Sequence, residues 1–95
     1  MESDTAQRGP VVVAVLTFKR PSVHEMRRLL RLRLRPIAHQ GIDVDQYAAK
    51  LKGLPHSAAE KLVNDARRRA LLRDSPRVEG ADLDAVLGDV TGRPW

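Results

Sequence analysis

The sequence contains no cysteine and only three aromatic residues, Phe18, Tyr47 and Trp95. The absence of cysteine excludes disulfide bonds, thiolate zinc sites and a cysteine nucleophile. With so few aromatic side chains, a core must be built from leucine, valine and alanine, which suits packed helices. The longest apolar run, Val11 to Phe18, is far too short to cross a bilayer, and the acidic residues before it argue against a signal peptide. We therefore expect a cytoplasmic protein with no membrane partner.

Catalytic patterns are also missing. No G-x-x-x-x-G-K-[ST] or G-x-G-x-x-G sequence is present, so both common glycine-rich phosphate loops are excluded. The histidines, at positions 24, 39 and 56, lie in separate segments without the spacing of metal ligands. We predict that this chain alone is not an enzyme and holds no metal or cofactor.

The chain has enough apolar sequence for one small domain. It has 95 residues, of which 42% are hydrophobic and 31% charged, a balance typical of a globular chain rather than a disordered one. Its net charge of +5 is compatible with a nucleic-acid partner, although a solvated arginine surface would give the same charge. We expect a disordered tail over residues 1–10, one helical domain over residues 11–90 and a second tail over residues 91–95.

The clearest helix signal covers residues 57–72. It follows Gly53 and Pro55, residue types that favour the start of a helix. Ser57 and Glu60 have the spacing of a capping box. An apolar stripe follows at helical spacing and consists of Ala59, Leu62, Val63, Ala66 and Ala70. We predict that this is the central helix, because small residues on its stripe allow neighbouring helices to approach closely.

Three further helices are predicted around it. A second capping box, Ser22 to Glu25, begins a helix over residues 22–35 that ends before a proline. Asp43 caps a short helix over residues 43–52, and the last helix covers residues 81–89. We expect a loop over residues 37–41 and an extended, buried Val78. The predicted shared core consists of Leu29, Leu30, Tyr47, Leu51, Leu62, Val63, Ala66, Leu83 and Leu87.

The run Val11 to Phe18 is rich in β-branched residues and is predicted to be a strand. No second run of this kind exists, so its backbone groups have no partner strand within the chain. We expect it to lie across the helices as an extended cover rather than to pair with a second copy. The predicted fold class is therefore mainly α, a four-helix bundle with one N-terminal extended strand segment.

Basic residues gather on the outer side of the first predicted helix and just before it. A solvated surface is the ordinary explanation for such charges. The alternatives are a phosphate-binding face and an interface with an acidic partner protein. The candidate phosphate or partner face consists of Arg27, Arg28, Arg31 and Arg35.

Several short segments follow one another in a recognisable order between about Val12 and Leu87. They are Phe18-Lys19-Arg20-Pro21, Met26-Arg27-Arg28-Leu29-Leu30, Val44 to Leu51, Gly53-Leu54-Pro55-His56-Ser57-Ala58-Ala59, Leu62 to Leu71 and Val78-Glu79-Gly80-Ala81-Asp82-Leu83. Each segment is a weak signal, but the ordered set is fairly specific. It resembles the C-terminal helical lid, or small subdomain, of AAA+ ATPases.

This resemblance implies a non-catalytic lid that closes over ATP or ADP bound by a separate P-loop core and contributes to subunit contacts in a ring. The Walker motifs, the catalytic glutamate and the arginine finger would lie in that core, so nucleotide would bind only together with it. In the family, the start of the third helix faces the adenine and ribose, which corresponds here to Gly53, Pro55, His56 and Ser57. The strand Val11 to Phe18 would be the last strand of the core.

Two positions depart from the lid pattern. Pro55 replaces the usual serine, and no arginine follows Gly53, as in the AAA branch that lacks the sensor-two arginine. The alternative function is a basic, histone-fold-like nucleic-acid-binding domain, because a long helix followed by Val-x-x-x-Asp-Leu and a short helix resembles the second half of a histone fold. We favour the lid, since the first helix and the strand have no place in a histone fold.

Overall fold

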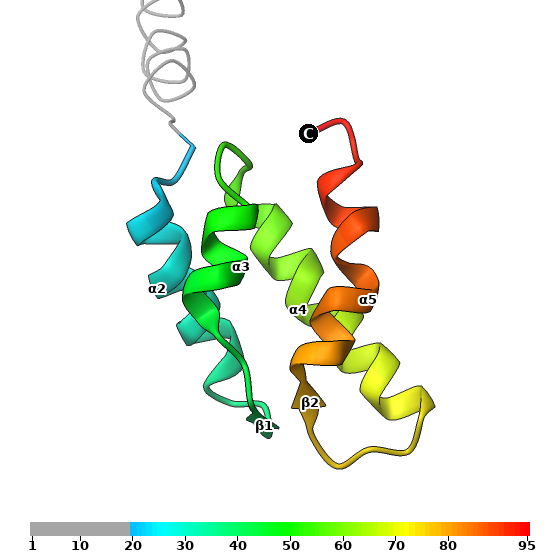
Figure 1. The fold of residues 1–95 in the computed structure, drawn as a ribbon. Coiled ribbons are helices and arrows are strands. Elements are labelled where there is room, and N and C mark those ends of the chain that lie inside the picture. Colours follow the sequence, from blue (N-terminus) through cyan, green and yellow to red (C-terminus); the bar gives the residue numbers. More distant parts are fainter. Residues whose placement is uncertain (1–19) are drawn as a thin grey trace, which may run out of the picture.

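The computed structural model describes residues 20–95, and these residues form four helices and two very short strands. The elements are α2 (Val23–Leu34), β1 (His39–Gln40), α3 (Val44–Lys50), α4 (His56–Leu72), β2 (Val78–Glu79) and α5 (Gly80–Thr91). The prediction of a mainly helical bundle is confirmed (Figure 1). The predicted tail over residues 1–10 and the predicted strand Val11 to Phe18 lie outside the described residues. None of these four helices is long and apolar enough to cross a membrane.

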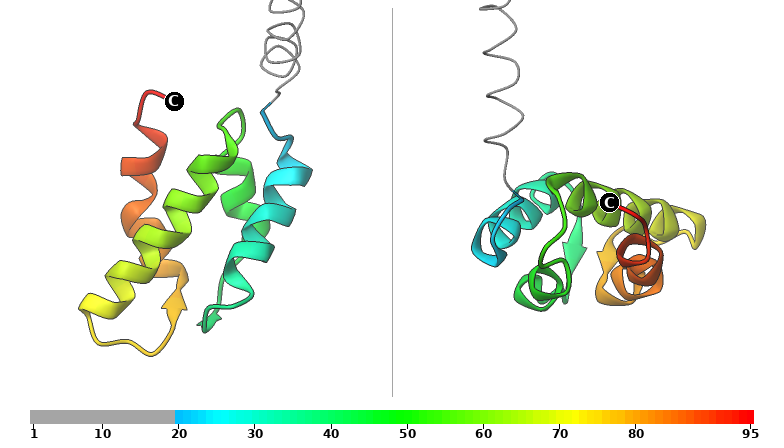
Figure 2. Two further views of the ribbon diagram at one scale, coloured as in Figure 1. Left: turned by 180° about the vertical axis from the view of Figure 1, so that it is seen from behind. Right: turned by 90° about the horizontal axis from the view of Figure 1, so that it is seen from above.

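Helix α4 is the centre of the arrangement (Figures 1 and 2). It packs against α2 and against α5, while α3 packs against α2. At about 1.5 Å per residue, α4 is roughly 25 Å long. The loop between α3 and α4 lies at the same end of the bundle as the C-terminus, and the two strands lie at the opposite end (Figure 1).

The starts of α2 and α3 are those predicted from the sequence. At α2, the Ser22 hydroxyl accepts a hydrogen bond from the Glu25 amide at 3.1 Å, and the Glu25 carboxylate accepts one from the Ser22 amide at 2.8 Å. This reciprocal capping box satisfies two amides that the helix itself cannot pair. At α3, the Asp43 carboxylate accepts a hydrogen bond from the Gln46 amide.

The predicted capping box at Ser57 is wrong. Helix α4 begins one residue earlier, at His56, and its N-cap is Pro55, which makes no side-chain hydrogen bond. The proline ring restricts φ to a value compatible with a helix start, and the Pro55 carbonyl accepts a hydrogen bond from the Ala58 amide at 3.0 Å. Ser57 therefore lies inside the first turn, and Glu60 forms an ion pair with Arg33 of α2.

The loop predicted over residues 37–41 contains a strand. Strand β1 pairs in parallel with β2, and His39 lies opposite Val78 while Gln40 lies opposite Glu79. Val78 is extended and buried, as predicted. The pairing ties the connection after α2 to the start of α5.

The C-terminal segment is more ordered than predicted. Helix α5 begins at Gly80 and ends at Thr91, so it extends past both ends of the predicted range 81–89. The indole nitrogen of Trp95 donates a hydrogen bond to the Val90 carbonyl at 2.7 Å. The predicted tail over residues 91–95 thus folds back against the end of α5, where Trp95 packs on the core.

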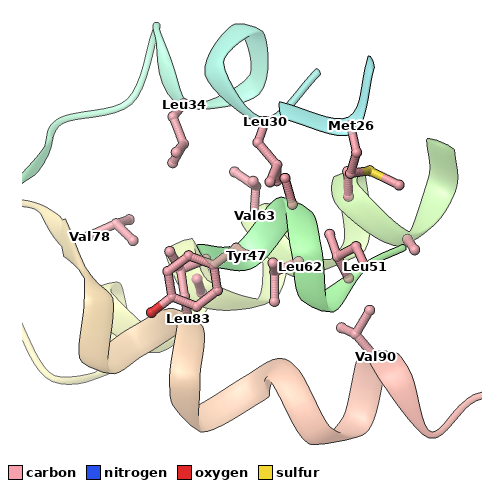
Figure 3. Close-up of a cluster of buried hydrophobic side chains, with 14 of the residues drawn as sticks. Met26, Leu30, Leu34, Tyr47, Leu51, Leu62, Val63, Val78, Leu83 and Val90 are labelled. Carbon is pink, nitrogen blue, oxygen red and sulfur yellow. The ribbon is translucent and has the colours of Figure 1, made fainter. Parts of the chain in front are cut away.

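The core is one cluster of buried side chains contributed by all four helices and by Val78 (Figure 3). Seven of the nine predicted members are buried, and Leu29 and Leu87 are half-buried against the cluster. Helix α4 contributes four alanines in addition to Leu62 and Val63. Because alanine side chains are short, α2 and α5 can pack close to the α4 backbone.

Tyr47 is the one buried aromatic residue in the described part of the chain. Its hydroxyl donates a hydrogen bond to the Asp84 carboxylate at 2.7 Å and lies 3.1 Å from the Gly80 carbonyl oxygen. Burial, together with the hydrogen bond to Asp84, raises the pKa of the Tyr47 phenol. Through this contact α3 is linked to the first turn of α5.

Candidate functional site

The four residues of the predicted nucleotide site are next to one another at the start of α4. Gly53 has φ +84°, and the position that a Cβ would take there has no neighbour within 4 Å. A side chain at Gly53 is therefore disfavoured by backbone conformation rather than by crowding. His56 and Ser57 are exposed, and Pro55 is half-buried.

The N-terminus of α4 contains no acidic group of its own. The cap residue has no side-chain acceptor, and the first turn contains no acidic residue. The other helices differ, because their first turns hold Glu25, Asp45 and Asp82. A helix end of this kind favours electron-rich or anionic groups.

Arg20 links the segment before α4 to the C-terminal residue. Its guanidinium donates to the Gly53 carbonyl at 3.4 Å and to the Trp95 carbonyl at 3.2 Å. Glu25 lies nearby: its pKa is lowered mainly by its hydrogen bonds with Ser22 and to a smaller extent by the charge of His56. Arg20 and Glu25, both from the N-terminal end of the described chain, thus lie near the start of α4.

The four arginines predicted as a phosphate or partner face do not act as one set. The Arg27 Nε lies 2.6 Å from the Asp45 carboxylate, and Arg31 lies 3.9 Å from the same oxygen. Arg28 and Arg35 are exposed and form no ion pair within residues 20–95. Two of the four cations therefore lie beside Asp45 of α3, and its negative charge lowers the positive charge available to an external anion.

A buried ion pair between the end of α4 and the start of α5 was missed. Asp82 is fully buried, and Arg73 donates to its two carboxylate oxygens at 2.8 and 2.5 Å. The Glu79 amide donates to the same carboxylate at 2.9 Å. The Arg73 guanidinium holds the pKa of Asp82 below its usual range, against the effect of burial. An acidic residue in a first helical turn is explained by the helix dipole alone, and the partner of Asp82 depends on the path of the turn between α4 and α5.

No group of three or more histidine, aspartate or glutamate side chains within residues 20–95 is arranged to hold a metal ion. Comparison of the chain with protein-family models and with curated proteins gives no match. An assignment of function therefore depends on the residues and on their geometry.

Proposed function

We propose that this chain is the helical lid of an AAA+ ATPase, from the branch without a sensor-two arginine. In this role it closes over ATP or ADP bound by a separate P-loop core and contributes to subunit contacts in a cytoplasmic ring. It supplies no catalytic residue. The observation that carries the proposal is the exposed N-terminus of α4, which has no side-chain cap and begins three residues after Gly53, within an order of helices that resembles the lid.

The chemistry of residues 53–57 suits a nucleoside better than a triphosphate. Pro55 offers an apolar ring, His56 an imidazole and Ser57 a hydroxyl, while Gly53 has no side chain to keep a ligand from the backbone. Flat apolar contacts with a few hydrogen bonds are typical of sites for small ligands. Tight binding of a triphosphate uses a cradle of amides, a lysine and a magnesium ion, and we expect the P-loop core to provide these.

The alternative, a basic histone-fold-like nucleic-acid binder, agrees less well with the packing. A histone fold has a long helix between two shorter ones, whereas α2 is an additional helix whose Met26, Leu30 and Leu34 are buried in the shared core. The engagement of Arg27 and Arg31 with Asp45 also reduces the cations available for phosphate.

An amide-shift titration with ATP tests the proposal. We expect a dissociation constant near or above about 1 mM, shifts confined to residues 53–59, and no ATP hydrolysis by the chain alone. His56→Ala should weaken these shifts, whereas His39→Ala, at the other end of the bundle, should leave them unchanged. A micromolar dissociation constant, or shifts centred on Arg28 and Arg35, would contradict the proposal.

Duplex DNA provides the test of the alternative. The lid proposal predicts weak, sequence-independent binding that is lost by about 0.15 M salt, because only a few phosphates would be contacted. Nanomolar binding that persists at this salt concentration would favour the nucleic-acid-binding function over the lid.

A further inference from the structure

A groove lies at the end of the bundle away from residues 53–57. It has a volume of about 540 Å³ and is bordered by the last turn of α2, the loop after it, the C-terminal half of α4 and the residues before β2. We call it the α2–α4 groove. In Figure 2 (left), α4 lies in front, and its C-terminal half points away from the end of α2. The two short strands lie behind α4 in this view.

The α2–α4 groove is lined by apolar side chains and by polar groups, and the polar groups contribute the larger part of its exposed surface. Val63, Ala70 and Val78 are buried core residues that reach its floor. Leu32 and Leu71 line it from α2 and α4 and expose 53% and 64% of their surfaces. Single exposed leucines are common, but Leu32 and Leu71 are exposed in the same groove and offer apolar contacts from two helices.

The charged residues along the α2–α4 groove are all positive. Arg33, Arg67 and Arg77 line it, and its lining includes no aspartate or glutamate. Arg33 is paired with Glu60, and Arg77 donates to Gln40. Arg67 is exposed and forms no ion pair within the part of the chain that the structure describes.

A second groove, between α4 and α5, provides a comparison. Its lining includes Asp65 and Asp89 beside Lys61, Arg68, Arg69 and Arg73. The α4–α5 groove is therefore lined by charges of both signs, whereas the charges that line the α2–α4 groove are all positive.

We propose that the α2–α4 groove binds an acidic amphipathic helix of a partner protein. Apolar side chains on one face of such a helix, spaced i and i+3 or i+4, would pack between Leu32 and Leu71. Carboxylates beside that face would interact with Arg67 and Arg77, so the charges of the two surfaces are complementary. This proposal does not depend on the lid function, because the groove and the start of α4 lie at opposite ends of the bundle.

Other occupants fit the α2–α4 groove less well. Single-stranded nucleic acid is held by stacking of bases on aromatic side chains, and no aromatic residue lines the groove. Phosphate groups would gain nothing from the exposed side chains of Leu32 and Leu71. A second copy of this chain, with its net charge of +5, would bring a positively charged molecule to a positive groove.

Helix α4 contains matched residues for a test. Arg67 and Leu71 line the α2–α4 groove, whereas Arg68 and Leu72, each the next residue in the sequence, line the α4–α5 groove. Both leucines are largely exposed, Leu72 at 82%, so their replacement should leave the fold intact. Circular dichroism and the thermal unfolding midpoint verify this for every variant.

The experiment measures fluorescence anisotropy of a labelled peptide against the full chain. The peptide has about 15 residues, roughly four helical turns, with leucines along one face and glutamates on both flanks. We expect micromolar binding that Leu71→Ser weakens about tenfold or more, because an apolar anchor is lost. Arg67→Glu should weaken binding severalfold, with a smaller effect at high salt. Leu72→Ser and Arg68→Glu should have no effect.

Two control peptides separate the contribution of charge to peptide binding from that of apolar contact. Replacing every glutamate of the peptide by glutamine, or every leucine by serine, should weaken binding in each case. Binding weaker than about 1 mM, or equal losses from both members of a matched pair, would overturn the proposal. Duplex DNA binding that depends on Arg67 but not on Leu71 would identify a phosphate site instead. A dimer that Leu71→Ser makes monomeric would assign the groove to a second copy.

Discussion

Removal of the Asp82 carboxylate tests how the ends of α4 and α5 are held together. The carboxylate is fully buried, and it accepts two hydrogen bonds from Arg73 and one from the Glu79 amide. Arg69 lies 3.6 Å from the same carboxylate. Asp82→Ala therefore removes the acceptor of the Glu79 amide and of the partly exposed Arg73 guanidinium.

The expected change in the free energy of unfolding follows from these contacts. Hydrogen bonds to a charged group contribute about 1.5–3 kcal/mol each, and breaking a buried ion pair costs about 3–5 kcal/mol. The outer part of Arg73 remains in contact with water, since its side chain is 39% exposed, and this reduces the loss. We expect Asp82→Ala to lower the free energy of unfolding by about 2–3 kcal/mol at neutral pH.

The pH dependence of the stability lost in Asp82→Ala provides a second test of the ion pair. Arg73 keeps the pKa of folded Asp82 below its usual range, so the stabilisation is complete above the unfolded-state pKa of about 3.9. It is lost as the pH falls through the lower pKa of the folded state. The difference between the parent chain and Asp82→Ala should therefore be constant from about pH 5 to 8 and decrease below about pH 4.

Urea denaturation followed by circular dichroism, repeated across this pH range, gives both quantities. Asp89→Ala is the matched control, because Asp89 lies in the same helix with 69% of its side chain exposed, and it should cost less than about 0.5 kcal/mol. A loss for Asp82→Ala as small as that of the control, or one that does not change in acid, would refute this account of the ion pair.

Three further predictions concern stability in urea. Leu62→Ala should cost about 2–5 kcal/mol, whereas Leu72→Ala should cost less than about 0.5 kcal/mol; similar losses would remove Leu62 from the core. Gly53→Ala should lower the free energy of unfolding by about 1 kcal/mol, because Gly53 has a positive φ. Gly88 lies on α5 with open space around it, so Gly88→Ala should raise the free energy of unfolding by about 0.5–1 kcal/mol. Effects of the same sign would contradict this reasoning. Tyr47→Phe should lower the free energy of unfolding by about 1 kcal/mol. Because folding raises the pKa of the phenol, the parent chain should lose this part of its stability above about pH 10, and the variant should not. An equal alkaline loss in the variant would argue against the buried phenol.

The sequence predicts the helices well where side chains act locally. The caps at Ser22 and Asp43 use a side chain and an amide a few residues apart, so their spacing alone identifies them. The apolar stripe of α4 likewise follows from helical periodicity. The start of α4 was placed one residue late, because Ser57 and Glu60 match a cap pattern while Pro55 can begin the helix without any side-chain bond.

Features that depend on segments far apart in the chain were not predictable in this way. The pairing of β1 with β2 involves two residues from each strand, too few to show a period. The division of the α2 arginines between ion pairs and solvent depends on where Asp45 and Glu60 lie in space. The α2–α4 groove is lined by residues of α2, of α4 and of the segment that leads into β2, so it depends on how these segments pack rather than on any one of them.

Amide-shift titrations of the chain with adenosine, inorganic tripolyphosphate and ATP test the lid proposal most directly. The resemblance implies that the start of α4 faces the adenine and ribose, and the groups at residues 53–57 suit a nucleoside. Adenosine and ATP should therefore shift the same amides within residues 53–59, whereas tripolyphosphate at equal concentration, which the positive helix end also attracts, should shift them less. If tripolyphosphate reproduces the shifts caused by ATP while adenosine causes none, the site recognises phosphate and the lid proposal is contradicted.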